Sequence, residues 1–390
     1  MTAPAAVPAD AAPGRGAIRV APVRDRRGHD RFLRLPNRLY AGHPGYVPPL
    51  AIERRQALSP RSNPFFAHAR VRYWLAWRGD RPVGRISAQI DDLALARHRN
   101  QTGHFGLLDA EDDPAVFEAL AASAEGWLRD HGMRRVRGPF NLSINEESGL
   151  LVEGFETPAV MLMGYAPRYA GRHIEALGYG KAKDLLAYDY DVTQGSAAAA
   201  RLLGRGGGGI GLRMLDRSHY DRELGIILDI FNDAWAENWG FVPFTEAEMA
   251  RIAREMRPLI RAEMVWIATI DGEPAAMIVC LPNLNEAIAD LDGRLWPLGW
   301  AKLLWRLKVR GLSSARVVMM GLRRRHQGTP QGSATVLMMI ESLRASIARL
   351  GFRRAELSWV LEDNWRMRRM IEGIGGHPYK VYRIYEKGLG

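Results

Sequence analysis

The fold of this chain is decided by the stretch Met264-Val-Trp-Ile-Ala-Thr-Ile270, the turn Asp271-Gly272, and the stretch Glu273-Pro-Ala-Ala-Met-Ile-Val-Cys-Leu281. Two apolar runs joined by Asp-Gly predict a β-hairpin, because that dipeptide suits the tight turn between antiparallel strands. The first half of the chain contains a matching pair of runs, Val71-Arg-Tyr-Trp-Leu-Ala-Trp77 and Pro82-Val-Gly-Arg-Ile-Ser-Ala-Gln-Ile90, separated by Gly79-Asp80. We therefore expect two hairpins that are copies of one unit.

The elements after each hairpin also repeat in the same order. In the first half, a strand over 103–108 precedes a helix that Asp113 caps and Pro114 opens. Its apolar face consists of Phe117, Leu120, Ala124, Trp127 and Leu128. In the second half, a strand over 316–321 precedes a basic, Gly-rich loop and a helix from Ser333. The apolar face of that helix consists of Val336, Leu337, Ile340, Leu343, Ile347 and Leu350.

Each half then continues with a strand (134–140 and 353–361), a helix (167–177 and 364–374) and a final strand with tyrosines. This order predicts an α/β (α+β) fold in two copies, each a mixed sheet flanked by helices. A chain of 390 residues is long enough for two cores. We expect a disordered tail over 1–16, a first domain over 17–192, a Gly/Ala linker over 193–211 and a second domain over 212–390.

The composition indicates a globular protein that stays in water, with 47% hydrophobic and 25% charged residues and no apolar run of about 18 residues. Cys280 is the single cysteine, which excludes an internal disulfide and a cysteine-rich zinc site. We expect a cytoplasmic protein without a metal. The net charge of +11 predicts an anionic partner. Nucleic acid is disfavoured, because the arginines are spread along the chain without a recognition helix.

The loop between the second-half strand and helix combines three features that favour anions. It contains Arg323, Arg324 and Arg325, the glycines Gly328 and Gly332, and the N-terminus of the helix that starts at Ser333. Glycine lets backbone N–H groups turn toward a ligand, the helix dipole attracts negative charge, and arginine binds phosphate oxygens in pairs. The loop therefore predicts a diphosphate site, and a solvated basic loop before an ordinary helix is the alternative.

This loop resembles the pyrophosphate signature of the GNAT acetyltransferase superfamily at Arg325-His-Gln-Gly328-Thr-Pro330, with Pro330 replacing the last small residue. The strand and helix around Asn364 resemble the next motif of that superfamily. The resemblance implies acyl-CoA as the donor, and a backbone N–H of Met319 or Met320 that polarises the thioester carbonyl. The residues implied for the cofactor side are Met319, Met320, Arg323, Arg324, Arg325, Gln327, Gly328, Gly332, Ser333 and Asn364.

The chain departs from the superfamily at two places. Ile371 occupies the position at which many members carry the tyrosine that protonates the leaving thiolate, so Tyr382 and Tyr379 become the candidates for that acid. The loop over 109–113 of the first half carries four carboxylates, which would repel a diphosphate. We expect the first domain to lack a cofactor loop and to serve as a scaffold or as a wall for the acceptor.

The segments Asn141–Phe155, Asn232–Pro243 and Tyr379–Lys387 resemble a bacterial family of tandem GNAT proteins, some of which are ceramide synthases. The resemblance implies an N-acyltransferase that moves a long-chain acyl group directly from CoA to the amine of a sphingoid base. Acetylation of a small amine and a degenerate, non-catalytic acyl-CoA-binding scaffold are the alternatives.

Proton removal from the amine needs a base, for which the candidates are Glu146, Glu147 and Glu237. The expected acceptor-binding residues are Asn145, Trp235, Asn238, Trp239 and Phe241. Each of these polar residues could instead cap a helix or pair with an arginine.

An inserted segment over 294–310 carries Trp296, Trp300 and Trp305 together with several lysines and arginines. Tryptophans beside a basic polar face are typical of a helix that lies in a membrane interface and contacts anionic lipid. We therefore expect peripheral contact with the inner face of the cytoplasmic membrane. The alternative is a crossover helix packed on the sheet with its lysines in water.

Overall fold

The computed structural model describes residues 16–195, 197–204 and 208–390. Within these ranges it shows a large mixed sheet flanked by helices, which confirms the predicted fold class. The expected tail lies outside the described residues except for Gly16. Residues 196 and 205–207 of the expected linker also lie outside, and between them runs a short helix, α6 (Ala197–Gly204).

The first half contains nine strands and five helices among its described residues. The strands are β1 (Ile18–Pro22), β2 (Ala69–Arg78), β3 (Arg81–Asp91), β4 (Thr102–Ala110), β5 (Arg135–Gly138), β6 (Phe140–Asn141), β7 (Glu147–Ser148), β8 (Leu150–Glu153) and β9 (Gly180–Asp191). The helices are α1 (Arg26–Leu39), α2 (Ala51–Ala57), α3 (Asp92–His98), α4 (Pro114–Asp130) and α5 (Arg168–Ala176).

The second half repeats much of this order after α6. Its strands are β10 (Ile210–Met214), β11 (Val265–Ile270), β12 (Glu273–Pro282), β13 (Ser314–Leu322), β14 (Arg354–Leu361) and β15 (His377–Gly388). Its helices are α7 (Tyr220–Ala234), α8 (Glu246–Met256), α9 (Leu284–Ile288), α10 (Gly299–Trp305), α11 (Pro330–Arg349) and α12 (Trp365–Gly373).

The hairpins and helix ends follow local sequence signals. The pairs β2–β3 and β11–β12 are antiparallel hairpins at the predicted positions. The side chain of Asp113 accepts a hydrogen bond from the backbone of Ala115 and so caps α4, as expected. Helix α11 begins at Pro330, three residues before the predicted Ser333, because the Thr329 hydroxyl caps it by accepting from Gly332 N at 2.9 Å.

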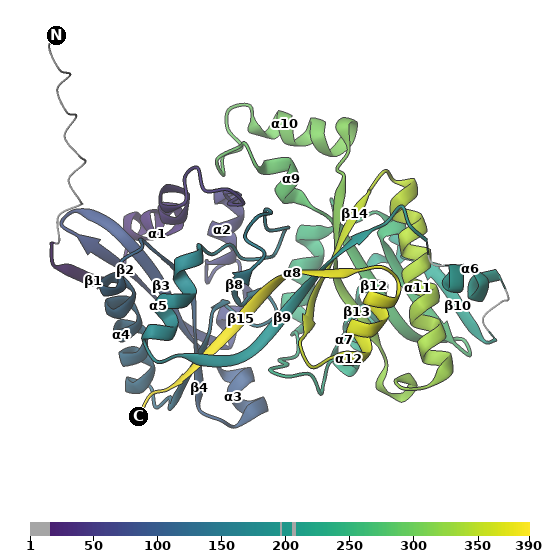
Figure 1. The fold of residues 1–390 in the computed structure, drawn as a ribbon, viewed down its shortest axis with the longest axis horizontal. Helices are drawn as coiled ribbons and strands as arrows, with labels where there is room; N and C mark the ends of the chain where they lie inside the picture. The colour runs from purple at the N-terminus through teal and green to yellow at the C-terminus, as the bar shows by residue number, and fades with distance from the viewer. Residues whose placement is uncertain (1–15, 196, 205–207) are drawn as a thin grey trace, which may run out of the picture.

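The two halves exchange their last strands. The sheet runs in the order β1-β2-β3-β4-β5-β15-β9-β14-β13-β12-β11-β10. Strand β9 of the first half therefore lies beside β14, and β15 of the second half lies beside β5. Figure 1 shows these two long strands crossing the middle of the molecule side by side. The exchange makes one continuous sheet, so the cores of the two halves are tied together by backbone hydrogen bonds.

Each half contains one parallel strand pair that separates after a few residues. In the first half, β4 and β5 pair from Thr102 to His104 only, and the space beyond is filled by the backbone of Phe140. A Cβ at Gly106 would lie 1.7 Å from the Phe140 carbonyl oxygen, and Gln89 Nε2 donates to that oxygen at 2.7 Å. In the second half, β13 and β14 pair from Ser314 to Val317 and then diverge. This second gap, which we call the β13–β14 split, opens into a cavity.

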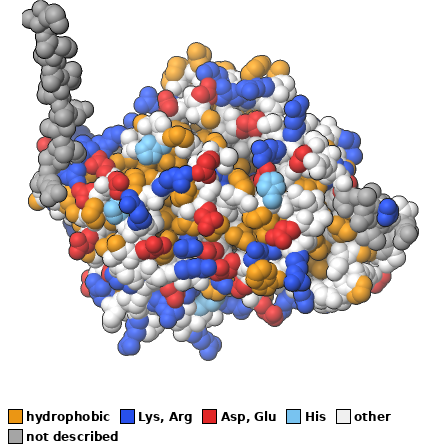
Figure 2. Space-filling model, viewed as in Figure 1, with side chains coloured by type: hydrophobic (Ala, Val, Ile, Leu, Met, Phe, Trp, Pro, Cys, Tyr) orange, Lys and Arg blue, Asp and Glu red, His pale blue; other side chains and the backbone are white. Residues whose placement is uncertain are grey.

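The segment over 294–310 projects from the body of the protein instead of packing on the sheet. None of the residues of α10 or of the π-helical turn Arg306–Arg310 is buried. Trp296 is 81% exposed, Trp300 48% and Trp305 53%. Figure 2 shows apolar and basic side chains next to one another over this projection at the top of the view. Among the helices described, none is long and apolar enough to cross a membrane.

Candidate active site

A cavity of about 840 Å³ lies around the β13–β14 split, which is the size of an ordinary small-molecule site. It reaches both faces of the sheet, with α11 and α12 on one face and the end of α7 on the other. It brings together most of the site residues expected from the sequence. These are Asn145, Trp235, Glu237, Asn238, Trp239, Phe241, Met319, Met320, Gln327, Gly328, Gly332, Ser333 and Asn364.

Glycines shape the loop at the α11 end of the cavity. Gly328 has φ +76°, in the left-handed region that favours glycine, and it lies beside the guanidinium of Arg366. A Cβ at Gly332 would lie only 2.1 Å from the carbonyl oxygen of His326, so a side chain does not fit there. The loop folds tightly onto the first turn of α11, and the N-terminus of that 20-residue helix faces the cavity.

The three arginines of the loop have different surroundings. Arg323 forms an ion pair with Asp229, and Arg324 donates to Glu237 at 2.9 Å, so both are held by carboxylates on or just after α7. Arg325 is exposed and contacts the ring of His326 at 3.0 Å. None of the three belongs to the cavity lining. Arg325 is therefore the loop arginine that is free to turn toward an anion at the mouth.

Two arginines that the sequence analysis did not single out line the cavity. Arg366 and Arg369 lie on α12, three residues apart and hence on one face of the helix. Arg366 approaches the Gly328 position to 3.2 Å. The sequence signal that could have identified them is their position just after Asn364, three residues apart on one helix. Asn364 itself caps α12 by accepting from Met367 N at 3.2 Å, which leaves its amide NH2 to offer to a ligand.

The split exposes backbone and indole groups to the cavity. Val318 has no partner on β12 because β13 bulges there, and the bulge lies where β14 leaves β13. The Met320 carbonyl accepts from Trp235 Nε1 at 3.0 Å. Trp359, on β14, also lines the cavity, and its buried Nε1 has no hydrogen-bond partner in the described parts of the chain. An orphaned N–H donor at this point fits a ligand that brings a carbonyl oxygen.

The opposite mouth of the cavity is formed by aromatic side chains and by the side-chain amides of Asn145 and Asn238. Trp239 lies under the cations of Arg137 at 4.8 Å and Lys183 at 5.7 Å, and Phe241 is 6% exposed. Asn145 donates to the Val242 carbonyl at 2.9 Å, which fixes its side chain at the rim. These contacts join a loop of the first half to the segment after α7.

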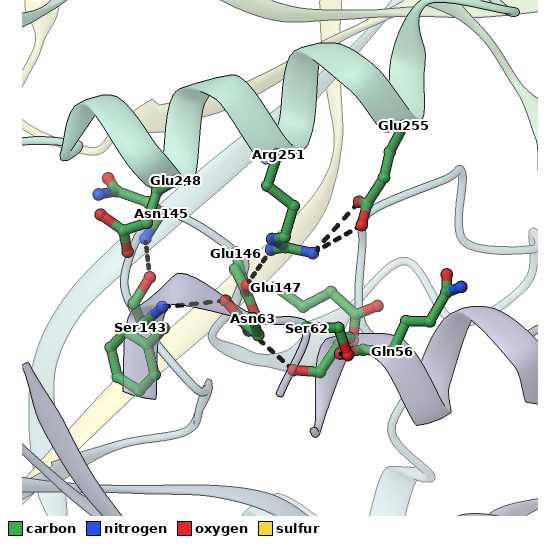
Figure 3. Close-up of polar contacts among 12 residues, drawn as sticks. Gln56, Ser62, Asn63, Ser143, Asn145, Glu146, Glu147, Glu248, Arg251 and Glu255 are labelled. Atoms are coloured by element: carbon green, nitrogen blue, oxygen red, sulfur yellow. Dashed lines mark hydrogen bonds and ion pairs between the residues drawn. The ribbon is translucent and has the colours of Figure 1, made fainter. Parts of the chain in front are cut away.

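The three candidate carboxylates differ in position. Glu237 is at the rim but its side chain is 79% exposed. Glu146 and Glu147 lie next to Asn145 and outside the cavity lining. In Figure 3, Arg251 extends from α8 between Glu146 and Glu255, and it donates to Glu146 at 3.2 Å.

The surroundings shift the pKa values of the two neighbouring glutamates in opposite directions. Burial raises the pKa of Glu146 to about 7, although Arg251 and Arg54 oppose the shift. Burial alone would also raise the pKa of Glu147. Arg54 at 2.5 Å and Asn141 at 2.7 Å outweigh it, so the pKa of Glu147 lies below its ordinary value. Glu147 is therefore a structural anion, whereas Glu146 can exchange a proton near neutrality.

The candidate tyrosines lie apart from the cavity. Tyr382 is fully buried, and its hydroxyl has no partner among the residues that the structure describes. Burial raises its pKa well above the ordinary value. Tyr379 donates its hydroxyl to Glu356. Ile371 lines the cavity as an apolar side chain. Nowhere in residues 16–195, 197–204 and 208–390 do three His, Cys, Asp or Glu side chains form a group that could hold a metal.

Comparison with solved structures gives the fold a name. A tandem GNAT protein from the clavulanic acid biosynthesis pathway superposes with a TM-score of 0.55 at 16% identity, over 96% of this chain and 99% of that one. A probable N-acyltransferase from Enterococcus faecalis V583 superposes with a TM-score of 0.51 at 8% identity, over 96% and 73%. At these identities the likeness concerns the fold alone. No protein-family model matches the chain.

Two curated proteins are similar over nearly the whole sequence. The chain is 50% identical over 375 residues to a protein named bacterial ceramide synthase from Caulobacter vibrioides (strain NA1000 / CB15N), which covers 95% of this chain and 98% of that one. It is 47% identical over 360 residues to protein YghO of Escherichia coli (strain K12), with 92% of each chain covered. These findings confirm the family resemblance and the enzyme class that the sequence predicted. The chain belongs to the family of tandem GNAT N-acyltransferases that includes the Caulobacter bacterial ceramide synthase.

Proposed function

We propose that this enzyme transfers a long-chain acyl group from a CoA thioester to the primary amine of a sphingoid base. The observation that carries the proposal is one continuous cavity that lies around the β13–β14 split and reaches both faces of the sheet. One end has the Gly328–Gly332 loop at the N-terminus of α11, and the other has an aromatic mouth with amides. The Caulobacter relative, which is named a ceramide synthase, supports the choice of acceptor.

The donor side fits a coenzyme A diphosphate. Gly328 and Gly332 bring the loop backbone close to the N-terminus of α11, where partial positive charge favours phosphate oxygens. Arg325, Arg366 and Arg369 add charge around the same loop, and the guanidinium groups can bind two phosphate oxygens each. A thiol arm bound here can follow the gap between β13 and β14.

The proposed reaction is a direct transfer. The amine nitrogen attacks the thioester carbonyl, a C–N bond forms, the C–S bond breaks, and one proton leaves the nitrogen. The backbone at the Val318 bulge and the free Nε1 of Trp359 are the proposed donors to the oxyanion. The thiolate takes up a proton from solvent or from the base, because Tyr382 and Tyr379 lie outside the cavity.

We propose Glu146 as the base, acting through one bridging water, because its side chain pairs with Arg251 and lies outside the cavity lining beside Asn145, which lines it. Glu147 is held by Arg54, and Glu237 is exposed and paired with Arg324. A carboxylate with a pKa near the working pH is the best proton acceptor, and Glu146 has a pKa of about 7.

The pH dependence of turnover tests this assignment. A base with a raised pKa is protonated and inactive below about pH 7, so kcat/KM should fall as the pH decreases through that value. Glu146→Gln should lower kcat by roughly 100-fold or more and abolish that acidic limb. Glu237→Gln is the matched control, with the limb retained. Retention of the limb in Glu146→Gln, or its loss in Glu237→Gln, would reassign the base.

We further propose that the segment over 294–310 docks on the inner face of the cytoplasmic membrane. Its exposed tryptophans, together with Leu298 and Val309 at 70% exposure, present an apolar surface to water. Arg294, Lys308 and Arg310 are exposed beside them and complement anionic headgroups. Arg306 is instead held by Asp290 at 2.5 Å and anchors the projection to the body.

Vesicle binding tests this surface. Replacing Trp296, Trp300 and Trp305 together by serine should weaken binding to phosphatidylglycerol vesicles by about tenfold or more, because three interfacial side chains are lost. Binding of the unaltered protein should also weaken as salt rises. The control is Trp365→Ser, which removes a tryptophan that is 59% exposed but lies on α12. Equal binding by the triple variant and the control would disprove docking through this segment.

The overall proposal is tested by thiol release from palmitoyl-CoA with and without sphinganine. Release that requires both substrates supports it. Release from acetyl-CoA with a small polar amine, and none with sphinganine, would favour the small-amine acetyltransferase alternative. Binding of acyl-CoA without release under any of these conditions would indicate the non-catalytic scaffold.

A further inference from the structure

Helix α1 carries a row of arginines on its exposed side. Its opposite side is apolar and packs Phe32 and Leu35 into the core of the first half. Arg27, Arg31 and Arg34 are exposed, and their spacing of three and four residues places them in one row along the helix. We call these three residues the α1 arginine row.

The positive charge of α1 exceeds its negative charge. The helix contains five arginines and one carboxylate, that of Asp30. Asp30 forms an ion pair with Arg55 of α2 at 2.8 Å. The N-cap Asp25 adds a second carboxylate, which accepts from Gly28 N at 2.6 Å. Both carboxylates therefore serve local contacts, and an excess of positive charge remains on the exposed side.

The row has few contacts of its own. Arg27 and Arg34 form no hydrogen bond or ion pair within residues 16–195, 197–204 and 208–390. Arg31 lies over the ring of Trp77 at 5.4 Å, a contact that orients the guanidinium and adds no negative charge. Guanidinium groups in this state can bind phosphate oxygens of a partner without breaking contacts within the protein.

Helix α2 connects the α1 arginine row to the projection over 294–310. The backbone N–H of Ala51, at the start of α2, donates to the Gly293 carbonyl at 2.9 Å. Gly293 also touches α1, because a Cβ there would lie 3.2 Å from Asn37 Nδ2. Beside this junction Ile52 is 56% exposed. Figure 1 shows α1, α2 and α10 together on the upper side of the view, so they contribute to one surface.

The chemistry of this surface changes from one end to the other. The projection offers exposed tryptophans, which insert at the level of the lipid headgroups. Helix α1 offers only guanidinium groups, since its apolar side is buried in the core. It can contact anionic headgroups but has nothing to insert. A nucleic acid would use the charges and leave the neighbouring apolar side chains in water, whereas an anionic membrane uses both.

We infer that the α1 arginine row is a second contact with anionic lipid, separate from the tryptophans of the projection. The row binds headgroups by charge alone, and the two contacts together fix the orientation of the protein on the membrane. This inference rests on the proposed docking through 294–310, since it adds the charged part of the same surface.

The test compares vesicles of phosphatidylcholine with vesicles that also contain phosphatidylglycerol, by co-sedimentation. Replacing Arg27 and Arg34 together by glutamine should weaken binding to the mixed vesicles by about tenfold or more and reduce its dependence on salt. Binding to pure phosphatidylcholine should stay the same, because the row contributes charge only. Arg31 is left in place because it packs on Trp77.

The matched control replaces Arg99 and Arg134 by glutamine. Both are exposed, and Arg99 follows α3 at the lower edge of Figure 1, away from α1. The control should bind both kinds of vesicle as the unaltered protein does. Equal binding of mixed vesicles by the row variant and the control would overturn the inference.

A separate comparison with the triple tryptophan variant distinguishes the two contacts. Loss of binding to both kinds of vesicle in that variant, with loss only on mixed vesicles in the row variant, is the expected result. A row variant that is impaired while the tryptophan variant is not would keep the row and contradict docking through 294–310. Binding of an oligonucleotide more tightly than mixed vesicles, lost in the row variant, would assign the row to nucleic acid and overturn the inference.

Discussion

Replacing Gly332 by alanine is expected to weaken acyl-CoA binding by about 100-fold. The added Cβ would lie 2.1 Å from the His326 carbonyl oxygen and 3.0 Å from Thr329 Oγ1, so the loop and the first turn of α11 must separate. The separation breaks the Thr329 cap and moves the N–H groups away from the diphosphate. The loss of two charge-assisted hydrogen bonds of about 1.5 kcal/mol each, the low end of their usual range, accounts for an effect of this size.

The measurement is the Kd for CoA and for palmitoyl-CoA by calorimetry, together with the circular dichroism spectrum. Gly373→Ala is the matched control, because this glycine also lies in a helix and a Cβ there meets nothing within 4 Å. The control should bind as the unaltered protein does. A Gly332→Ala variant that is folded and binds CoA with unchanged affinity would show that the loop does not hold the diphosphate.

Replacing Arg316 by methionine is expected to destabilise the protein by about 3–5 kcal/mol, the usual cost of breaking a buried ion pair from one side. Arg316 is 4% exposed on β13 and donates to Ser358 Oγ and to the Met161 carbonyl, both at 2.9 Å. It also lies 3.8 Å from Glu356, which is equally buried. The substitution leaves that carboxylate without its cation, and it removes a contact between the two halves.

Urea unfolding at neutral pH measures this effect. Arg353→Met, on an exposed residue just before β14, should change stability by less than about 0.5 kcal/mol. Adding Glu356→Gln to Arg316→Met should recover part of the loss, because the unpaired charge is then removed. A loss below about 1 kcal/mol in the single variant would mean that Arg316 does not hold the halves together.

Much of the fold could be predicted because its signals are local. The two hairpins, the Asp113 cap and the apolar face of α11 depend on turn residues and helical periodicity within a few residues of one another. The proposed cofactor loop was identified in the same way, since Gly328, Gly332 and the arginines are neighbours in sequence. The structure then adds the reason that only glycine fits at 332.

Non-local features were not accessible from the sequence. The exchange of β9 and β15 depends on which edge each strand finds, and no local sequence signal specifies that edge. Arg323 and Arg324 looked like phosphate ligands but pair with carboxylates on or just after α7, about 90 residues earlier in the chain. Arg366 and Arg369 face the cavity only because α12 folds back beside the loop. The sequence allowed two interpretations of the segment over 294–310, a helix in a membrane interface or a crossover helix packed on the sheet. The exposure of its tryptophans favours the first.

The most direct test of the account is a competition experiment read by mass spectrometry. The enzyme is given equal amounts of acetyl-, octanoyl- and palmitoyl-CoA together with equal amounts of sphinganine and spermidine, and every amide formed is identified. N-palmitoyl-sphinganine is the expected main product, and Gly332→Ala should form little of it. N-acetyl-spermidine as the main product would contradict the account.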